Sequence, residues 1–208
     1  MIWMTGFTVI PLLMVFCYGL TDRSGAFTLA NILAISSSEH LKALWLSLAL
    51  AGVSTVICLV LAYPLALILR KRHIGKGSFV VFIFILPMWM NFLLRTMAWQ
   101  TLLEKNGVIN TFLTMLHLPN IAIINTPAAI ILGMVYNFLP FMVLPIYNTL
   151  AKIDDNVINA ARDLGADNYQ TLTKILLPLS VPGIVSGITM VFVPALTTFV
   201  ISNLLGGS

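Results

Sequence analysis

The densest group of polar side chains in this sequence lies between residues 151 and 182, where Asp, Arg, Asn, Gln and Lys interrupt long apolar runs. Ala161 and Gly165 are four residues apart and therefore share one helical face, with Ala160 beside it. This face is nearly bare backbone, which would let a large partner approach closely. The pattern predicts a docking site, and the alternative is an ordinary amphipathic helix at the lipid boundary.

Arg95 is a second candidate, because it is a charge inside the apolar run 79–103. At about 1.5 Å of rise per residue, it lies roughly 24 Å along a helix that starts at Phe79. Asn91 and Trp99 share its face, since each is four residues away. A charge at such a depth predicts a functional role, and the alternative is an arginine that snorkels to lipid headgroups beside a tryptophan.

The apolar run 127–150 adds Tyr136, Asn137 and Phe141 as candidates for a solute path, with ordinary helix packing as the alternative for each. No Asp or Glu lies deep in an apolar run. A cationic solute would therefore rely on aromatic faces such as Trp99, Tyr136 and Tyr147, or on a partner chain.

Catalytic and metal sites find little support. Cys17 and Cys58 lie in apolar runs without metal-binding spacing, and the histidines, at 40, 73 and 117, lie far apart in expected polar connections. A membrane enzyme would need a nucleophile beside a base, and ATP hydrolysis would need a GxxxxGK[ST] phosphate loop. We expect no catalytic residue, no metal site and no bound cofactor.

Composition identifies the setting in which these residues act. The chain is 59% hydrophobic and 9% charged, whereas a soluble domain has about 25% charged residues. A net charge of +4 is too small to indicate nucleic-acid binding. The chain is therefore expected to be an all-α integral membrane protein.

Segments of about 20 apolar residues can span a bilayer as helices, and five qualify: 1–20, 43–69, 79–103, 127–150 and 183–205. The stretch from Arg70 to Lys76 holds four of the eleven Lys and Arg residues, which marks the cytoplasmic side. Alternation then places the N-terminus and the 151–182 connection in the cytoplasm, and the 104–126 connection outside.

Several spans carry signs of close helix packing. Ala43, Ser47, Ala51 and Thr55 place small side chains on one face, and Gly183 and Gly187 have GxxxG spacing. Prolines that would kink the spans stand at positions 64, 87, 140, 145 and 194. We expect a bundle that could surround a wet path, although packing alone would also explain each proline.

Local signals divide the 151–182 connection into two helices. Asp154 or Asp155 can cap a first helix, 154–164, and Gly165 can end it in the left-handed conformation. Asp167 is a second cap, and Pro178 is expected to close the second helix. Its apolar stripe would be formed by Leu172, Ile175, Leu176 and Leu179.

This stretch resembles the EAA loop of type I ABC importer permeases, the MetI-like kind. The loop's pattern is Glu-Ala-Ala, three residues, Gly, nine residues, then Ile-x-Leu-Pro. Here Asn159-Ala160-Ala161 is followed by Gly165 and by Ile175 to Pro178, so that only the first position differs. The stretches 93–110 and 132–150 and the terminal LLGG resemble the permeases of spermidine/putrescine importers more loosely.

The resemblance implies one transmembrane subunit of an importer in the bacterial inner membrane. Its partners would be a cytoplasmic ATPase dimer that uses ATP and Mg, a second permease and an external substrate-binding protein. Helix 154–164 would transmit ATPase closure as a rigid body. The coupling residues would be Asn159, Ala160, Ala161, Asp163, Gly165, Ile175, Leu177 and Pro178.

Two departures from the family pattern stand out. Asn159 replaces the Glu expected to contact the ATPase, and the alternatives are compensation for the lost charge by Asp163 or Asp155 and a weaker contact. The family usually has six spans, and the five visible here suggest that a sixth is missing. The alternatives are a permease for another small solute and a self-sufficient secondary transporter or channel, which usually shows internal repeats that we do not find.

Overall fold

The computed structural model describes residues 2–21, 26–29, 37–71, 86, 88–121 and 123–206. The chain divides into two compact units, Met1–Leu48 and Ala49–Ser208, which are described separately. The expectation that residues 1–208 form a single permease domain stays a prediction.

The first unit consists of an apolar helix and the start of a longer one. Helix α1 spans Ile2–Gly19 and contains Pro11. After it, the backbone N–H of Thr28 donates to the carbonyl of Leu20 at 2.8 Å, beside an isolated bridge between Thr21 and Phe27.

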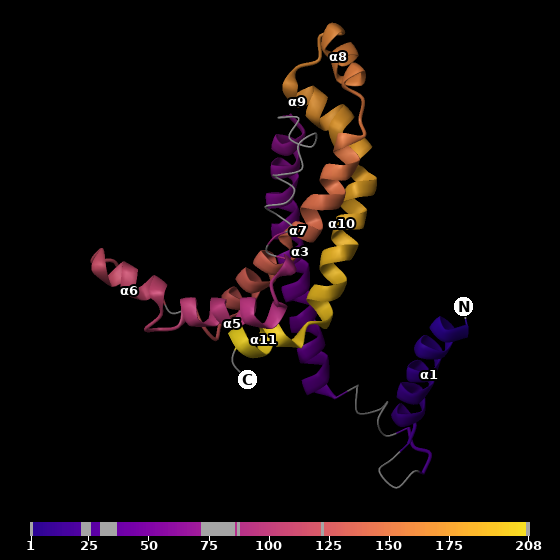
Figure 1. Ribbon diagram of the computed structural model, residues 1–208, viewed down its shortest axis with the longest axis vertical. Coiled ribbons are helices and arrows are strands. Elements are labelled where there is room, and N and C mark those ends of the chain that lie inside the picture. The colour runs from indigo at the N-terminus through magenta and orange to yellow at the C-terminus, as the bar shows by residue number, and fades with distance from the viewer. Residues whose placement is uncertain are drawn as a thin grey trace. The chain divides into compact units, whose positions relative to one another are not determined.

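The described residues of the second unit form helices joined by short turns and loops, without strands (Figure 1). Helices α8 and α9 lie at one end of the long helices α7 and α10, and α5, α6 and α11 lie at the opposite end. The elements are α3 (Ser38–Lys71, which begins in the first unit), α5 (Phe92–Leu103), α6 (Val108–Met115), α7 (Pro127–Ala151), α8 (Asp155–Asp163), α9 (Asn168–Thr171), the π-helical η2 (Leu172–Leu176), α10 (Leu177–Thr197) and α11 (Phe199–Gly206).

Three helices of the described residues are long and apolar enough to cross a membrane: Ser38–Lys71, Pro127–Ala151 and Asn168–Thr197. The first two confirm the helices predicted over 43–69 and 127–150. The predicted span 1–20 forms α1, whose stretch Thr5–Gly19 is apolar but shorter than these three helices. Much of the span predicted over 79–103 lies outside the described residues, and its described part is α5.

The prediction of one helix over 183–205 is wrong at both ends. Pro178 does not close the preceding helix, because η2 joins α9 to α10 and the helix runs on to Thr197. In η2 the N–H of Leu177 donates to the carbonyl of Leu172, one residue further back than in an α-helix. This wider turn lies just before Pro178, whose ring would collide with the carbonyl four residues earlier in a regular α-helix.

The GxxxG pair makes α7 and α10 pack closely, as predicted. A Cβ atom at Gly183 would lie 2.5 Å from Oγ1 of Thr149, and one at Gly187 would lie 2.7 Å from Sδ of Met142. The two backbones therefore approach at a distance that only glycine permits. Prolines 64, 140, 145 and 194 lie inside helices as expected, and position 87 lies outside the described residues.

Small side chains also line the packed face of α3 within the second unit. Ala51 and Thr55 are buried as predicted, but Ala43 is exposed and Ser47 is only partly covered. The Ser54 hydroxyl lies 3.5 Å from Sδ of Met134 in α7. The buried face continues toward the end of the helix through Cys58, Ala62, Ala66 and Leu69.

The helix predicted to end near residue 205 breaks at Thr198, which has an extended backbone. Beyond the break, α11 turns onto α7, where Ile201 and Leu205 are buried against Gly133. The carbonyl of Leu205 also accepts a hydrogen bond from the N–H of Asn125 at 2.8 Å. This contact ties the last described helix to the segment that precedes α7.

Candidate coupling loop and solute path

Helix α8 has defined ends, as the sequence predicts. Asp154 is its N-cap and accepts a hydrogen bond from the N–H of Asn156 at 2.9 Å. Gly165 follows its last turn with a φ of +85°, in the left-handed region that favours glycine. A short capped helix with a fixed corner is a rigid element.

The second helix of the loop begins with a capping box. The Asp167 carboxylate accepts from the N–H of Gln170 at 2.6 Å, and the Gln170 side chain accepts from the N–H of Asp167 at 3.3 Å. These bonds satisfy donors at the helix start. Because this helix continues into α10, the corner at Gly165 joins α8 directly to a membrane-crossing helix.

The two sides of α8 differ in their burial. Ile158 is buried, and Ala161, three residues later, is half-buried. Asn159, Ala160 and Asp163 are exposed. The predicted face of small residues is therefore divided. Ala161 is partly covered by the protein's own packing, whereas Ala160 is exposed and open to a partner.

Two large exposed side chains flank this corner and were missed in the sequence. Leu164 is 89% exposed and Tyr169 is 73% exposed, beside the exposed Gly165. Both side chains are therefore accessible to a partner in the most polar stretch of the chain. The sequence did carry a signal for Leu164 and Tyr169, because neither residue belongs to the predicted apolar stripe.

The last part of the motif lies within the long helix. Leu176 is buried and Ile175 is half-buried, whereas Leu177 and Pro178 are exposed. These residues therefore belong to the transition between the loop and the helix α10. Of the predicted stripe, Leu172 is half-buried and Leu179 is exposed.

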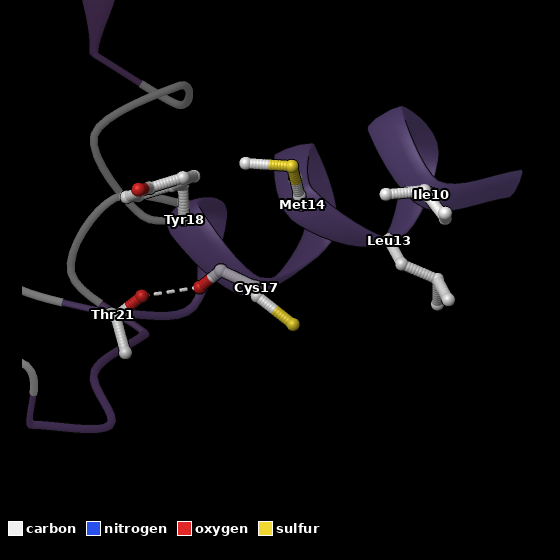
Figure 2. A pocket seen from close by; sticks show the side chains of 6 residues that line it. All are labelled: Ile10, Leu13, Met14, Cys17, Tyr18 and Thr21. Carbon is white, nitrogen blue, oxygen red and sulfur yellow. Dashed lines mark hydrogen bonds between the residues drawn. The ribbon is translucent and has the colours of Figure 1, made fainter. Parts of the chain in front are cut away.

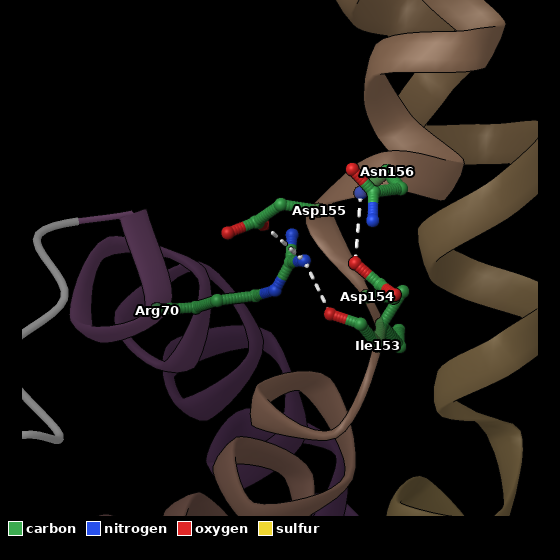
Figure 3. Close-up of polar contacts among 5 residues, drawn as sticks. All are labelled: Arg70, Ile153, Asp154, Asp155 and Asn156. Atoms are coloured by element: carbon green, nitrogen blue, oxygen red, sulfur yellow. Dashed lines mark hydrogen bonds and ion pairs between the residues drawn. The ribbon is translucent and has the colours of Figure 1, made fainter.

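A contact between α3 and the start of α8 was also missed. The Arg70 guanidinium donates to the carbonyl oxygen of Ile153 at 2.9 Å and to Oδ1 of Asp155 at 3.0 Å (Figure 3). In the sequence Arg70 was part of a basic cluster that indicated orientation only. Nothing in the spacing links it to a carboxylate 85 positions later.

Three of the candidate path residues meet between α5 and α7. Cζ of Arg95 lies 5.9 Å from the ring centroid of Tyr136, and the Trp99 and Tyr136 rings meet edge to face at 5.1 Å. Arg95 is only 7% exposed. A buried guanidinium over an aromatic ring is an arrangement typical of a cation–π contact.

The remaining candidates have local structural roles. Asn91 caps α5, since its side chain accepts from the N–H groups of Leu93 and Leu94 at 2.8 and 3.3 Å. Asn137 is buried and donates to the carbonyl of Gly133 at 2.7 Å. Phe141 is half-buried in α7, 6.5 Å from the Phe138 ring. Tyr147 is buried.

One hollow lies along α1. It is lined by Ile10, Leu13, Met14, Cys17, Tyr18 and Thr21 (Figure 2). The Thr21 hydroxyl donates a hydrogen bond to the carbonyl oxygen of Cys17 there. Within the described part of the chain, no group of three or more His, Cys, Asp or Glu side chains could hold a metal ion.

Comparison with known proteins identifies a family for this arrangement. The family described as "Binding-protein-dependent transport system inner membrane component" matches residues 55–208. The spermidine/putrescine transport system permease protein PotB of Haemophilus influenzae is 36% identical over 215 residues, which cover 99% of this chain and 75% of that protein. PotB of Escherichia coli is 37% identical over 214 residues, with 99% and 78% covered.

A third relative is the inner membrane ABC transporter permease protein YdcU of Escherichia coli, 32% identical over 193 residues, with 86% of this chain and 62% of that protein covered. The fold resembles the crystal structure of a bacterial alginate ABC transporter in complex with an alginate pentasaccharide-bound periplasmic protein, with a TM-score of 0.71. That match is 20% identical and covers 88% of this chain and 65% of the other. The likeness confirms the predicted all-α permease fold.

Proposed function

The chain belongs to the family of inner membrane components of binding-protein-dependent transport systems, and we propose that it couples ATP hydrolysis in a separate subunit to solute import. It is a multi-pass inner membrane transport protein and a homologue of ABC permease subunits. The observation that carries the proposal is helix α8, a capped rigid helix with exposed Asn159 and Ala160 at one end of α7 and α10.

The proposed partner of α8 is a cytoplasmic ATPase that dimerises on ATP. Its cleft would receive the exposed side of α8 and the two large side chains at the corner, Leu164 and Tyr169. A second permease subunit would complete the channel, and an external binding protein would deliver the solute. ATP and Mg would belong to the ATPase, with no catalytic group or cofactor in this chain.

Coupling would follow from how α8 is held. The fixed corner at Gly165 leads through η2 into α10, so that a displacement of α8 is passed to a membrane-crossing helix. On the other side, Asp154 caps α8 only three residues after α7 ends at Ala151. Closure of the ATPase dimer would thus move two packed helices together.

Asn159 would make a neutral contact where the family pattern calls for a carboxylate. It is exposed on α8, and Asp163 is exposed one turn later. Asp163 could therefore supply a charge to the same partner, because side chains four apart share a face. Asp155 is a poorer substitute, since its carboxylate is joined to Arg70.

The proposed solutes are polyamines such as spermidine and putrescine. The support is the identity with PotB proteins across nearly the whole chain. Trp99 and Tyr136 would offer aromatic faces to a cationic solute. Arg95 would repel that solute, which suits a gate, or a dock for a carboxylate of the binding protein.

The proposal also includes an orientation, with the N-terminus and α8 in the cytoplasm. It follows from the basic residues between Arg70 and Lys76. A cysteine introduced at the exposed Leu164 should react with a membrane-impermeant maleimide only after the membrane is opened. Labelling of Leu164→Cys from outside intact cells would contradict this orientation and support the opposite one.

Uptake of labelled spermidine by proteoliposomes tests the proposal as a whole. The complete transporter should accumulate spermidine only with ATP on the ATPase side, and unlabelled putrescine should compete. If amines do not compete but another solute does, the polyamine assignment is wrong and the permease role stands. Uptake driven by an ion gradient without an ATPase would instead identify a secondary transporter.

A further inference from the structure

Arg70 differs from the basic residue beside it. Its side chain is 13% exposed, whereas Lys71, the last residue of α3, is exposed. No hydrogen bond or ion pair joins Lys71 to any residue that the structure describes. Lys71 can therefore interact with lipid headgroups as an ordinary interfacial cation, while Arg70 is committed to a specific contact.

The two acceptors of Arg70 lie in the short link between α7 and α8 and at the start of α8. Nη2 donates to the carbonyl oxygen of Ile153, which lies in this link, and to the carboxylate of Asp155, the first residue of α8 (Figure 3). Helix α8 is thus joined to α7 by the chain and to α3 by Arg70.

The two contacts differ in strength. The Asp155 side chain is 63% exposed, and an ion pair with an exposed carboxylate contributes little because water and salt screen it. The carbonyl of Ile153 is fixed in the main chain, and a charged donor strengthens a hydrogen bond to it. The contact with Ile153 therefore restrains the link itself.

We infer that Arg70 is a positioning residue that makes α3 follow α8 when α8 moves. The inference rests on the proposed function, in which an ATPase displaces α8. Without Arg70, α8 would still present Asn159 and Ala160 to the ATPase. Its displacement would then be taken up by rotation within the link at residues 152–154, and α3 would be left behind.

The readout is the number of solute molecules imported per ATP hydrolysed. Arg70→Met keeps the apolar stem and removes both contacts, and it should lower this ratio about tenfold, as expected for a charged hydrogen bond. Asp155→Asn leaves the Ile153 contact and should lower the ratio less. The ratio in Arg70→Lys should lie between those of Arg70→Met and the wild type. Lys71→Met should keep the wild-type ratio.

The experiment uses the complete transporter in proteoliposomes and follows labelled spermidine uptake and phosphate release in the same vesicles. A wild-type ratio in Arg70→Met overturns the inference, whether its two rates are unchanged or fall together. If Arg70→Met does not assemble, a wild-type ratio in both Arg70→Lys and Asp155→Asn overturns the inference. If the wild-type complex shows no ATP-dependent uptake, the proposed function itself fails, which is a separate result.

Discussion

Gly183 in α10 lies directly against Thr149 in α7, with space for no side chain between them: a Cβ atom at Gly183 would be 2.5 Å from Oγ1 of Thr149 and 2.7 Å from the carbonyl oxygen of Pro145. Gly183→Ala should force the two helices apart and cost about 1–3 kcal/mol of stability. Thermal unfolding of the purified protein in detergent measures this loss.

Gly52 in α3 is the matched control for this substitution. A Cβ atom at Gly52 would meet no atom within 4 Å. Gly52→Ala should therefore leave the melting temperature unchanged or raise it, since alanine favours a helix over glycine. Equal destabilisation by both alanines would show that the contact of Gly183 with α7 is not tight.

The corner at Gly165 should depend on backbone conformation and not on space. Its φ is +85°, and a Cβ atom there would meet nothing within 4 Å. Gly165→Val should cost roughly 1–2 kcal/mol and shift the angle between α8 and α9, because branched residues avoid this region. Gly165→Asn should be milder, since asparagine tolerates it. The efficiency of ATP-driven uptake compares the two, and equal activity would argue against a fixed corner.

Tyr136 should stabilise the packing of α5 on α7 through its ring. It contacts both Arg95 and Trp99. Tyr136→Phe keeps both ring contacts and should melt like the wild type. Tyr136→Leu should lose about 1–2 kcal/mol, the sum expected for an aromatic pair and a cation–π contact. If the Phe variant is as unstable as the Leu variant, the hydroxyl and not the ring matters.

The cap of α8 offers a milder change at the same loop. The carboxylate of Asp154 accepts from the N–H of Asn156. Asp154→Ala should weaken the helix by about 1 kcal/mol, and Asp154→Ser should largely restore it. Hydrogen exchange at the amide of Asn156 reports the difference. Equal exchange in the two variants would mean that the cap does not hold this end of α8.

The local features of the loop could be predicted because short-range chemistry determines them. Asp154 and Asp167 cap the helices that follow them, and Gly165 adopts the left-handed conformation. Each depends on residues within one helical turn. The expectation at Pro178 failed, since a proline within the first turn of α10 is compatible with a helix that widens before it.

Contacts between distant segments could not be read from spacing. Arg70 meets Asp155, and Arg95 meets Tyr136, through the packing of separate helices. The intramembrane charge of Arg95 was recognisable as unusual, but its partner depends on how α5 lies on α7. The division of α8 into a covered and an open side likewise follows from the burial of Ile158.

This division defines the variant that tests docking most cleanly. Ala160 is exposed, so a large side chain there would leave the fold of this chain intact. A bulky residue at the half-buried Ala161 would disturb the protein's own packing as well. Ala160→Ser keeps the position small and is the control for Ala160→Trp.

The most direct measurement is the amount of ATPase that copurifies with the tagged chain from membranes that contain the complete transporter. The wild type and Ala160→Ser should retain the ATPase in stoichiometric amounts and support ATP-driven uptake. Ala160→Trp should insert at wild-type levels but lose both the ATPase and uptake. Wild-type ATPase binding and uptake by Ala160→Trp would contradict a coupling role for α8.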